Sequence, residues 1–235
     1  MIIKPGQNTV KFIERRGLKF FSPFWAVDKG REAIKIHYDG TPGVSSRILA
    51  SNEYGRVLGQ YNIKFLKDER AIKASTLVVD DNDHGRGIGQ MLTLSGLIEL
   101  FANKLNTFKL FSLKDTMGFH AKMGFKLDTD DVDYIKYGLK FIKKKDKIDH
   151  YAARDADFFL SRITNPEKLK EDPSLLEHAA YVISKYMTDI MRRGQEWHMP
   201  LYMQGSNFKF TDWEILVEKN YLNELLEKYK IDFHF

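Results

Sequence analysis

Residues Leu77 to Leu92 read LVVDDNDHGRGIGQML, and this stretch decides how the fold is interpreted. An apolar run ends in a polar turn, three glycines follow at alternate positions, and an apolar helical pattern then begins. A strand that turns through glycines into a helix leaves several backbone N–H groups without intrahelical acceptors, at the positive end of the helix dipole. We therefore predict that the loop Gly85–Gly89 binds phosphate oxygens.

The spacing of the glycines excludes two common kinds of phosphate-binding loop. A dinucleotide fingerprint requires a third glycine where this chain has Gln90 or Leu92, and no Lys-Ser or Lys-Thr pair follows the glycines as in a P-loop. The remaining pattern, H-G-R-G-I-G, resembles the [RQ]-x-x-G-x-[GA] signature of the GCN5-related N-acetyltransferases (GNAT family). In that family the loop holds the pyrophosphate of acetyl-coenzyme A (acetyl-CoA).

A second segment supports the resemblance. Residues Phe119 to Phe125 read FHAKMGF, which is similar to a later family block of aromatic residues, a short helical stretch and Gly-Phe. The resemblance covers about residues 32–141 and implies an α+β fold: a GNAT-like mixed, mostly antiparallel sheet flanked by helices. The family has helices between its first two strands, but this chain has only the turn Asp39–Ser46 there.

The chain is expected to form three parts. Residues 1–30 are predicted to be an irregular N-terminal arm packed on a neighbour, 31–145 an acetyl-CoA-binding domain, and 146–235 a helical region docked on that domain. The pattern predicts strands at 32–38, 47–50, 56–66, 71–79, 108–113 and 133–142. It predicts helices at 87–105, 151–163, 173–194 and 211–229, the last three with apolar stripes typical of a core.

The resemblance implies roles for the strand and its loop. A backbone amide near Val78 or Val79 would polarise the thioester carbonyl, and the strand and loop would hold the pantetheine arm and the pyrophosphate. His84 stands where the family prefers Arg or Gln, and Arg86 is a candidate for supplying the charge. The predicted cofactor-binding residues are Leu77, Val78, Val79, His84, Gly85, Arg86, Gly87, Ile88, Gly89 and Gln90.

Proton transfer requires further residues. His120 lies four residues before Gly124, where many family members have a tyrosine as the general acid, and histidine titrates near pH 7. Asp80, Asp81 and Glu53 flank strand ends and are the candidate bases. The family's asparagine at the start of this helix has no clear equivalent. The other histidines have no paired ligand spacing, so no metal is expected.

Composition limits the class of protein. The 235 residues carry a net charge of +5 and no cysteine, so there is no disulfide framework and no cysteine nucleophile. The sequence has neither an apolar run long enough for a membrane span nor a signal peptide, and a cytoplasmic location is the simplest expectation. The densest basic run, Lys143–Lys145, is short and interpreted as a solvated face, so nucleic acid is not expected as a partner.

The function expected from these patterns is acetyl transfer from acetyl-CoA to an amine. The alternatives are a non-catalytic binding or structural protein of the same fold, with a degenerate site, and a nucleic-acid-associated protein using the Lys143 region. Fold alone does not separate these functions. The amine acceptor, the general base and the oligomeric state stay open at this point.

Overall fold

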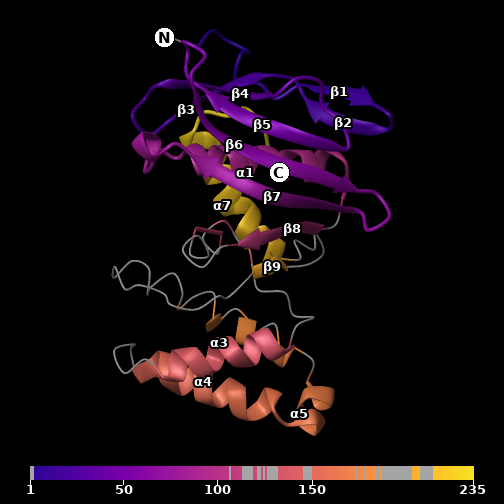
Figure 1. Cartoon of the computed structure of the whole chain (residues 1–235), viewed down its shortest axis with the longest axis vertical. Coiled ribbons are helices and arrows are strands. Elements are labelled where there is room, and N and C mark those ends of the chain that lie inside the picture. The colour runs from indigo at the N-terminus through magenta and orange to yellow at the C-terminus, as the bar shows by residue number, and fades with distance from the viewer. Residues whose placement is uncertain are drawn as a thin grey trace. The chain divides into compact units, whose positions relative to one another are not determined.

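A computed structural model gives the fold in two compact units (Figure 1). The first comprises Met1–Lys109 and Phe208–Phe235, and the second Leu110–Asn207. These limits differ from those expected at Gly30 and Lys145. The structure describes residues 3–105, 107–112, 119–120, 123, 125, 132–144, 150–172, 174–176, 178–180, 182–183, 186, 203–206 and 214–235.

The first unit is built on a sheet in which antiparallel neighbours follow one another along the chain. Its strands are β3 (Phe24–Val27), β4 (Ala33–Tyr38), β5 (Ser45–Ser51), β6 (Val57–Leu66) and β7 (Ala71–Val79), and β8 (Thr107–Ser112) is next to β7. Only a turn joins β4 to β5, as predicted from the sequence. The predicted strands at 32–38, 47–50, 56–66, 71–79 and 108–113 are confirmed.

The residues expected to form an irregular arm are largely strands instead. Besides β3, they form a separate antiparallel hairpin of β1 (Phe12–Arg15) and β2 (Leu18–Phe21). The aromatic cluster of this segment explains the difference, because Phe20, Phe21 and Phe24 are buried and therefore need regular backbone pairing around them.

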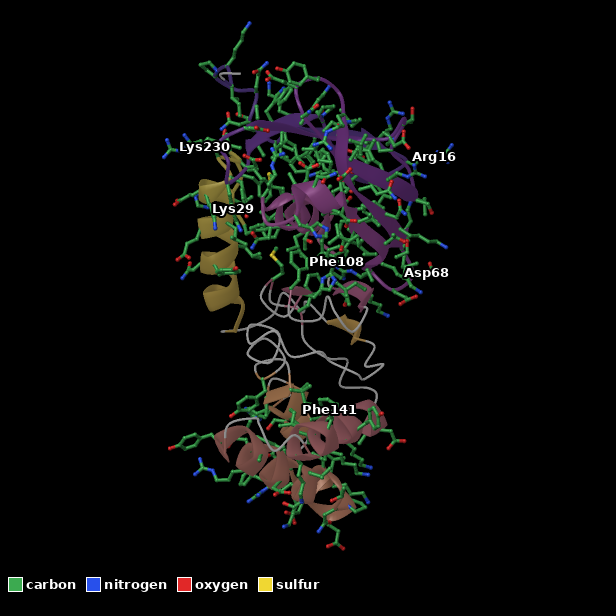
Figure 2. The ribbon with its side chains drawn as sticks, turned by 60° about the vertical axis from the view of Figure 1, so that its left-hand side comes forward. Arg16, Lys29, Asp68, Phe108, Phe141 and Lys230 are labelled. Carbon is green, nitrogen blue, oxygen red and sulfur yellow. The ribbon has the colours of Figure 1, made fainter. Side chains whose placement is uncertain are left out.

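The β1–β2 and β6–β7 turns, labelled by Arg16 and Asp68, lie at the same end of this unit (Figure 2). Lys67 Nζ donates to the Arg16 carbonyl there at 3.1 Å.

Helix α1 (Ile88–Ala102) lies across one face of the sheet, and most of its side chains are buried. Two glycines allow this close approach. A Cβ on Gly59 of β6 would lie 3.1 Å from both Ile88 and Leu92, and a Cβ on Gly96 would lie 2.8 Å from the Phe108 ring. The predicted helix at 87–105 is thus confirmed, and it places its first turn at the end of β7.

The chain returns to the first unit at its C-terminus. Helix α7 (Glu214–Lys228) matches most of the helix expected at 211–229, while Thr211, its expected N-cap, lies outside the described residues. Tyr229 and Ile231 beyond the helix are buried. Backbone bonds then join the two ends of the chain, because Asp232 donates to Asn8 at 3.0 Å and accepts from Val10 at 3.1 Å.

The described part of the second unit is mainly helical. It contains α3 (Val132–Lys144), α4 (His150–Ile163), α5 (Pro166–Glu171) and the short strand β9 (Met203–Ser206). The strand expected at 133–142 is wrong: these residues belong to α3, and Ile135, Leu139 and Ile142 are buried at helical spacing. Helix α4 confirms the expectation at 151–163. Of the helix expected at 173–194, the described residues between Leu175 and Tyr186 are helical, and the rest lies outside them.

Helices α3 and α4 pack against each other. A Cβ on Gly138 would lie 2.9 Å from Ile183, so this glycine lets a third helical segment approach α3. Lys143, the first residue of the basic run, pairs with Asp157 of α4 at 2.5 Å. In the part of the chain that the structure describes, no helix is long and apolar enough to cross a membrane.

Candidate functional site

The loop between β7 and α1 has the geometry of an anion site. Gly85 and Gly87 have φ angles of +78° and +93°, which glycine adopts without strain. Gly87 is the N-cap of α1 and provides no side-chain cap. Among hydrogen bonds between described residues, none uses the backbone N–H groups from Gly85 to Gln90 as donors. Several donors therefore accompany the positive end of a helix of 15 residues.

The turn before the loop is held by its own polar groups. Asp80 N donates to the Leu58 carbonyl at 2.9 Å, which ends the β6–β7 ladder. The Asp80 carboxylate then caps the 3₁₀ turn Asp81–Asp83 by accepting from Asn82 N at 3.0 Å. His84 is exposed, and its Nε2 lies 3.1 Å from the Val79 carbonyl. The direction in which the loop leaves the strand is fixed by these bonds.

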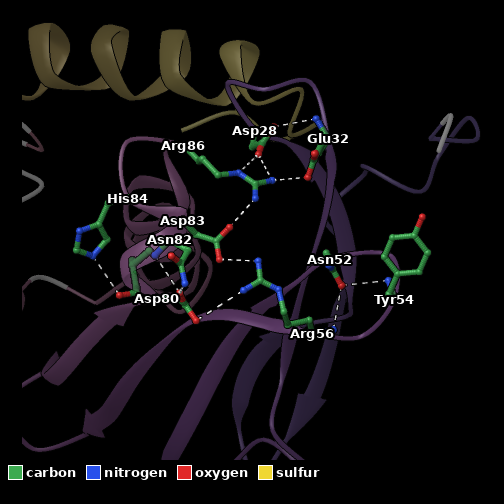
Figure 3. Close-up of polar contacts among 11 residues, drawn as sticks. Asp28, Glu32, Asn52, Tyr54, Arg56, Asp80, Asn82, Asp83, His84 and Arg86 are labelled. Atoms are coloured by element: carbon green, nitrogen blue, oxygen red, sulfur yellow. Dashed lines mark hydrogen bonds and ion pairs between the residues drawn. The ribbon is translucent and has the colours of Figure 1, made fainter.

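Arg86 turns away from the loop into a cluster of carboxylates (Figure 3). Its Nε donates to Asp28 at 2.6 Å, Nη1 to Asp83 at 2.5 Å and Nη2 to Glu32 at 2.6 Å. Arg56 continues the cluster through Asp83 at 2.7 Å. Desolvation alone would lower the pKa of Arg86, but the three carboxylates more than offset it and the pKa is raised. The side chains of Asp28 and Asp83 are 0% and 1% exposed, so Arg86 neutralises buried charge.

Tyr229, which directly follows α7, packs against the same loop. An added Cβ on Gly87 would lie 2.7 and 2.8 Å from Cε1 and Cζ of the Tyr229 ring. The Tyr229 hydroxyl donates to Oε1 of Gln90. The backbone carbonyl of Tyr229 accepts from Val27 N at 2.8 Å. Desolvation raises the pKa of Tyr229 to about 12, with smaller contributions from Tyr221 and Asp28. Gly87 is thus required both by its positive φ and by the ring beside it.

The other predicted residues of the first unit lie at the end of β7. Leu77 and Val79 are half-buried and Val78 is exposed, paired across the ladder with Gln60 of β6. Ile88 is buried beneath the first turn of α1, while Gly89 and Gln90 are half-buried. The candidate bases differ: Asp80 is a cap that also lies 3.6 Å from Arg56, whereas Asp81 is fully exposed.

His120 belongs to the second unit and is 6% exposed. Its ring makes edge contacts with those of Phe119 and Phe125, with centroids 5.1 and 5.7 Å away. Nδ1 has no hydrogen-bond partner among the described residues. Desolvation by these surroundings lowers the pKa of His120 to about 4, so the ring is neutral at pH 7. Burial disfavours the protonated ring, which argues against the acid role suggested by the sequence and also makes His120 a weak base at pH 7.

Three contacts at the site were not predicted. Asp28 is 58 residues from Arg86, and Tyr229 is 139 residues from Gln90, so no local pattern relates them. Asp83 lies within the sequence Leu77–Leu92, but no pattern in that sequence distinguishes a buried carboxylate from a solvated one. Within the described residues, no group of three or more His, Asp or Glu side chains could hold a metal ion.

Of the comparisons with known proteins, only the comparison with solved structures found matches. No family model matches the sequence, and no curated protein matches it. Tetrahymena GCN5 is 15% identical, with 34% of this chain and 49% of that chain covered and a TM-score of 0.31. The first three solved chains are covered over only 42 to 51% of their own length.

Two other matches cover more of the solved chain. A GNAT family acetyltransferase from Elizabethkingia anophelis, solved with acetyl-CoA bound, is 17% identical, covering 40% of this chain and 77% of that one at a TM-score of 0.35. Nourseothricin acetyltransferase is 14% identical, with 44% of this chain and 74% of that chain covered and a TM-score of 0.29. The resemblance is to GNAT acetyltransferases. The structure itself confirms the expected α+β fold class, with antiparallel pairing from β3 to β7 and helix α1 across one face of the sheet.

Proposed function

We propose that the chain is an N-acetyltransferase that uses acetyl-CoA and transfers the acetyl group to an amine of a small molecule or a protein. One observation carries the proposal. The N–H groups from Gly85 to Gln90, at the start of α1, have no acceptor among the described residues. Such a group of donors fits the pyrophosphate of coenzyme A, whose charge the helix dipole also favours.

The reaction would use the backbone more than charged side chains. The neutral amine attacks the thioester carbonyl, the carbon–sulfur bond breaks, and the thiolate takes up a proton. Backbone N–H groups at the end of β7, near Val78 and Val79, are proposed to stabilise the oxyanion. The exposed Val78 supports an accessible strand end. Leu77 and His84 are proposed to line the pantetheine arm and the loop.

His120 of the second unit is proposed to take part in proton transfer, the role that the sequence resemblance implies. Its Nδ1, which lacks a partner among the described residues, supports this role, whereas the lowered pKa disfavours the protonated ring. Positioned acid–base groups typically contribute about 10² to 10⁴ in rate. His120→Phe should therefore lower kcat at least about tenfold while the affinity for acetyl-CoA changes only a few-fold. A wild-type rate in this variant would make His120 a packing residue.

A non-catalytic protein with a GNAT-like fold is the second candidate. The contacts of Arg86 favour it, because the one cation of the loop is bound to Asp28, Asp83 and Glu32. Asp80 is likewise occupied as a cap. A protein of this kind would bind coenzyme A or another anion at the loop without transferring an acetyl group.

Thermal denaturation and thiol release separate the candidates. Acetyl-CoA at about a hundred times its Kd should add about 2.7 kcal/mol to the free energy of unfolding. Acetyl transfer to a panel of small amines and lysine peptides is followed as release of the coenzyme A thiol. Stabilisation without thiol release from any acceptor would favour the non-catalytic candidate. If millimolar acetyl-CoA gives no stabilisation, the proposal that the loop binds coenzyme A is wrong.

A further inference from the structure

A second anion site is indicated on the face of the sheet opposite α1. A groove of about 650 Å³ crosses β5, β6 and β7 there, near the β6–β7 turn. On β6 and β7 the lining residues Asn62, Lys64 and Lys73 alternate with buried residues such as Tyr61, Phe65 and Ile72. The polar lining residues are Ser45, Ser46, Arg47, Asn62, Lys64, Glu69, Lys73 and Ser75.

Two lysines in this groove face each other. Lys64 of β6 and Lys73 of β7 are direct cross-strand partners, and both are exposed. Directly opposite residues have Cβ atoms about 4.5–5.5 Å apart, and like charges at this spacing destabilise a sheet. Among the described residues, neither lysine forms a hydrogen bond or an ion pair that would relieve this repulsion. No described acidic side chain therefore compensates their charges.

The other charges of the groove are already paired. Glu69 is bound by Lys109 at 2.5 Å, and Arg47 is bound by Asp39 at 3.1 Å. Glu69 is the one acidic side chain in the lining, so the groove retains the positive charge of the two lysines. Hydroxyl and amide groups surround them, and these are the side chains that commonly accompany lysine at phosphate oxygens.

The backbone adds a local irregularity at the same place. Asn62 pairs with Thr76 and Ile63 with Ala74, so Ser75 is an extra residue that forms a β-bulge. Bulges redirect side chains and are frequent beside binding sites. Ser75 is exposed and lines the groove beside Lys73.

We propose that this groove binds a small phosphorylated molecule, with Lys64 and Lys73 as its charge partners. The volume lies in the range of small-ligand sites, about 300–1,000 Å³. The lining contains no aromatic side chain on which a base could stack, which disfavours single-stranded nucleic acid as the occupant. The site shares no residue with the Gly85–Gln90 loop and does not depend on the function proposed for that loop.

Inorganic triphosphate is a suitable probe. It is titrated into the full chain at constant ionic strength, and backbone amide shifts are followed by NMR. Saturable shifts are expected at Lys64, Lys73 and Ser75, separate from any at Gly85–Gln90. Shifts confined to Gly85–Gln90, or none at all, would overturn the proposal.

A double variant gives a second readout. Lys64→Ala/Lys73→Ala should weaken triphosphate binding in the groove at least about tenfold and raise the melting temperature without ligand, because the repulsion is removed. Lys11→Ala/Lys140→Ala makes the same charge change at two exposed lysines and should do neither. Equal effects of the two double variants would contradict the proposal. Tighter binding of a short single-stranded oligonucleotide than of triphosphate, through the same lysines, would also overturn it.

Discussion

The carboxyl group of Glu99 is buried inside the first unit. It is 0% exposed, accepts from Phe21 N at 3.1 Å and also accepts from the Tyr38 hydroxyl. Its second oxygen has no partner among the described residues. Desolvation raises the pKa of Glu99 well above its usual value, and the bond from Phe21 offsets this only in part. The folded state therefore keeps a proton that the unfolded state releases.

This proton makes stability depend on pH. Since the folded pKa is raised, the full stability is present below the unfolded pKa and is lost as pH rises toward the folded pKa, by up to about 1.4 kcal/mol per pH unit. Glu99→Gln keeps an acceptor oxygen but cannot ionise. Urea denaturation should show this pH slope above about pH 5 in the wild type, and Glu99→Gln should lack it. The exposed Glu14→Gln is the control, and an unchanged slope in Glu99→Gln would show that Glu99 ionises freely.

Arg86 is predicted to act on stability more than on ligand binding. Arg86→Met would leave the buried carboxylates of Asp28 and Asp83 without this partner. Breaking a buried pair by removing one member costs about 3–5 kcal/mol. Asp28→Asn combined with Arg86→Met should recover part of the loss. If Arg86→Met unfolds like the wild type and instead loses affinity for acetyl-CoA, then Arg86 is a ligand of the cofactor.

The segment after α7 supports the loop before α1. The Tyr229 ring fills the space beside Gly87, and its hydroxyl binds Gln90. Tyr229→Phe removes one hydrogen bond and should cost about 0.5–1.5 kcal/mol. Tyr229→Ala removes the ring and should cost about 3–5 kcal/mol.

Hydrogen exchange separates local support from general stability. In Tyr229→Ala the amides from Gly85 to Gln90 should exchange faster than the rest of α1, whereas Tyr229→Phe should change them little. Tyr221→Phe, at a partly exposed position on α7, is the matched control. Uniform acceleration along α1 in Tyr229→Ala would mean that Tyr229 stabilises the unit without positioning the loop.

Local periodicity predicted the elements that surround the site. The change from the β-branched run at Leu77 to glycines and then to a helical pattern identified β7, the loop and α1. It failed at 133–142, where Ile135 and Leu139 belong to one buried helical stripe but their neighbours also suggest strand alternation. It also failed in the first 30 residues, because an aromatic cluster without clear alternation gave no strand signal.

The chain leaves its first unit at Lys109 and returns to it at Phe208. Sequence patterns describe residues a few positions apart, so they cannot reveal that Tyr229 packs on Gly87 or that Asp28 pairs with Arg86. The Tyr229 contact depends on this return, and the Asp28 contact depends on the order of the strands in the sheet. The loop itself was predictable, whereas the side chains that hold it were not. The expected docking of the residues after 146 on the cofactor domain stays a prediction.

We propose that coenzyme A phosphates bind the backbone of the Gly85–Gln90 loop. Gly85 offers a matched pair of variants, because an added Cβ meets nothing within 4 Å and its positive φ suits Asn or Asp better than other side chains. Gly85→Asn and Gly85→Asp have nearly the same shape and differ by one negative charge. Calorimetric Kd values for acetyl-CoA are the direct measurement.

We expect saturable binding by the wild type and by Gly85→Asn. Gly85→Asp should bind at least about tenfold more weakly than Gly85→Asn, because its carboxylate lies beside the pyrophosphate, and added salt should reduce the difference. Equal Kd values for the two variants, or no binding by the wild type, would contradict the claim.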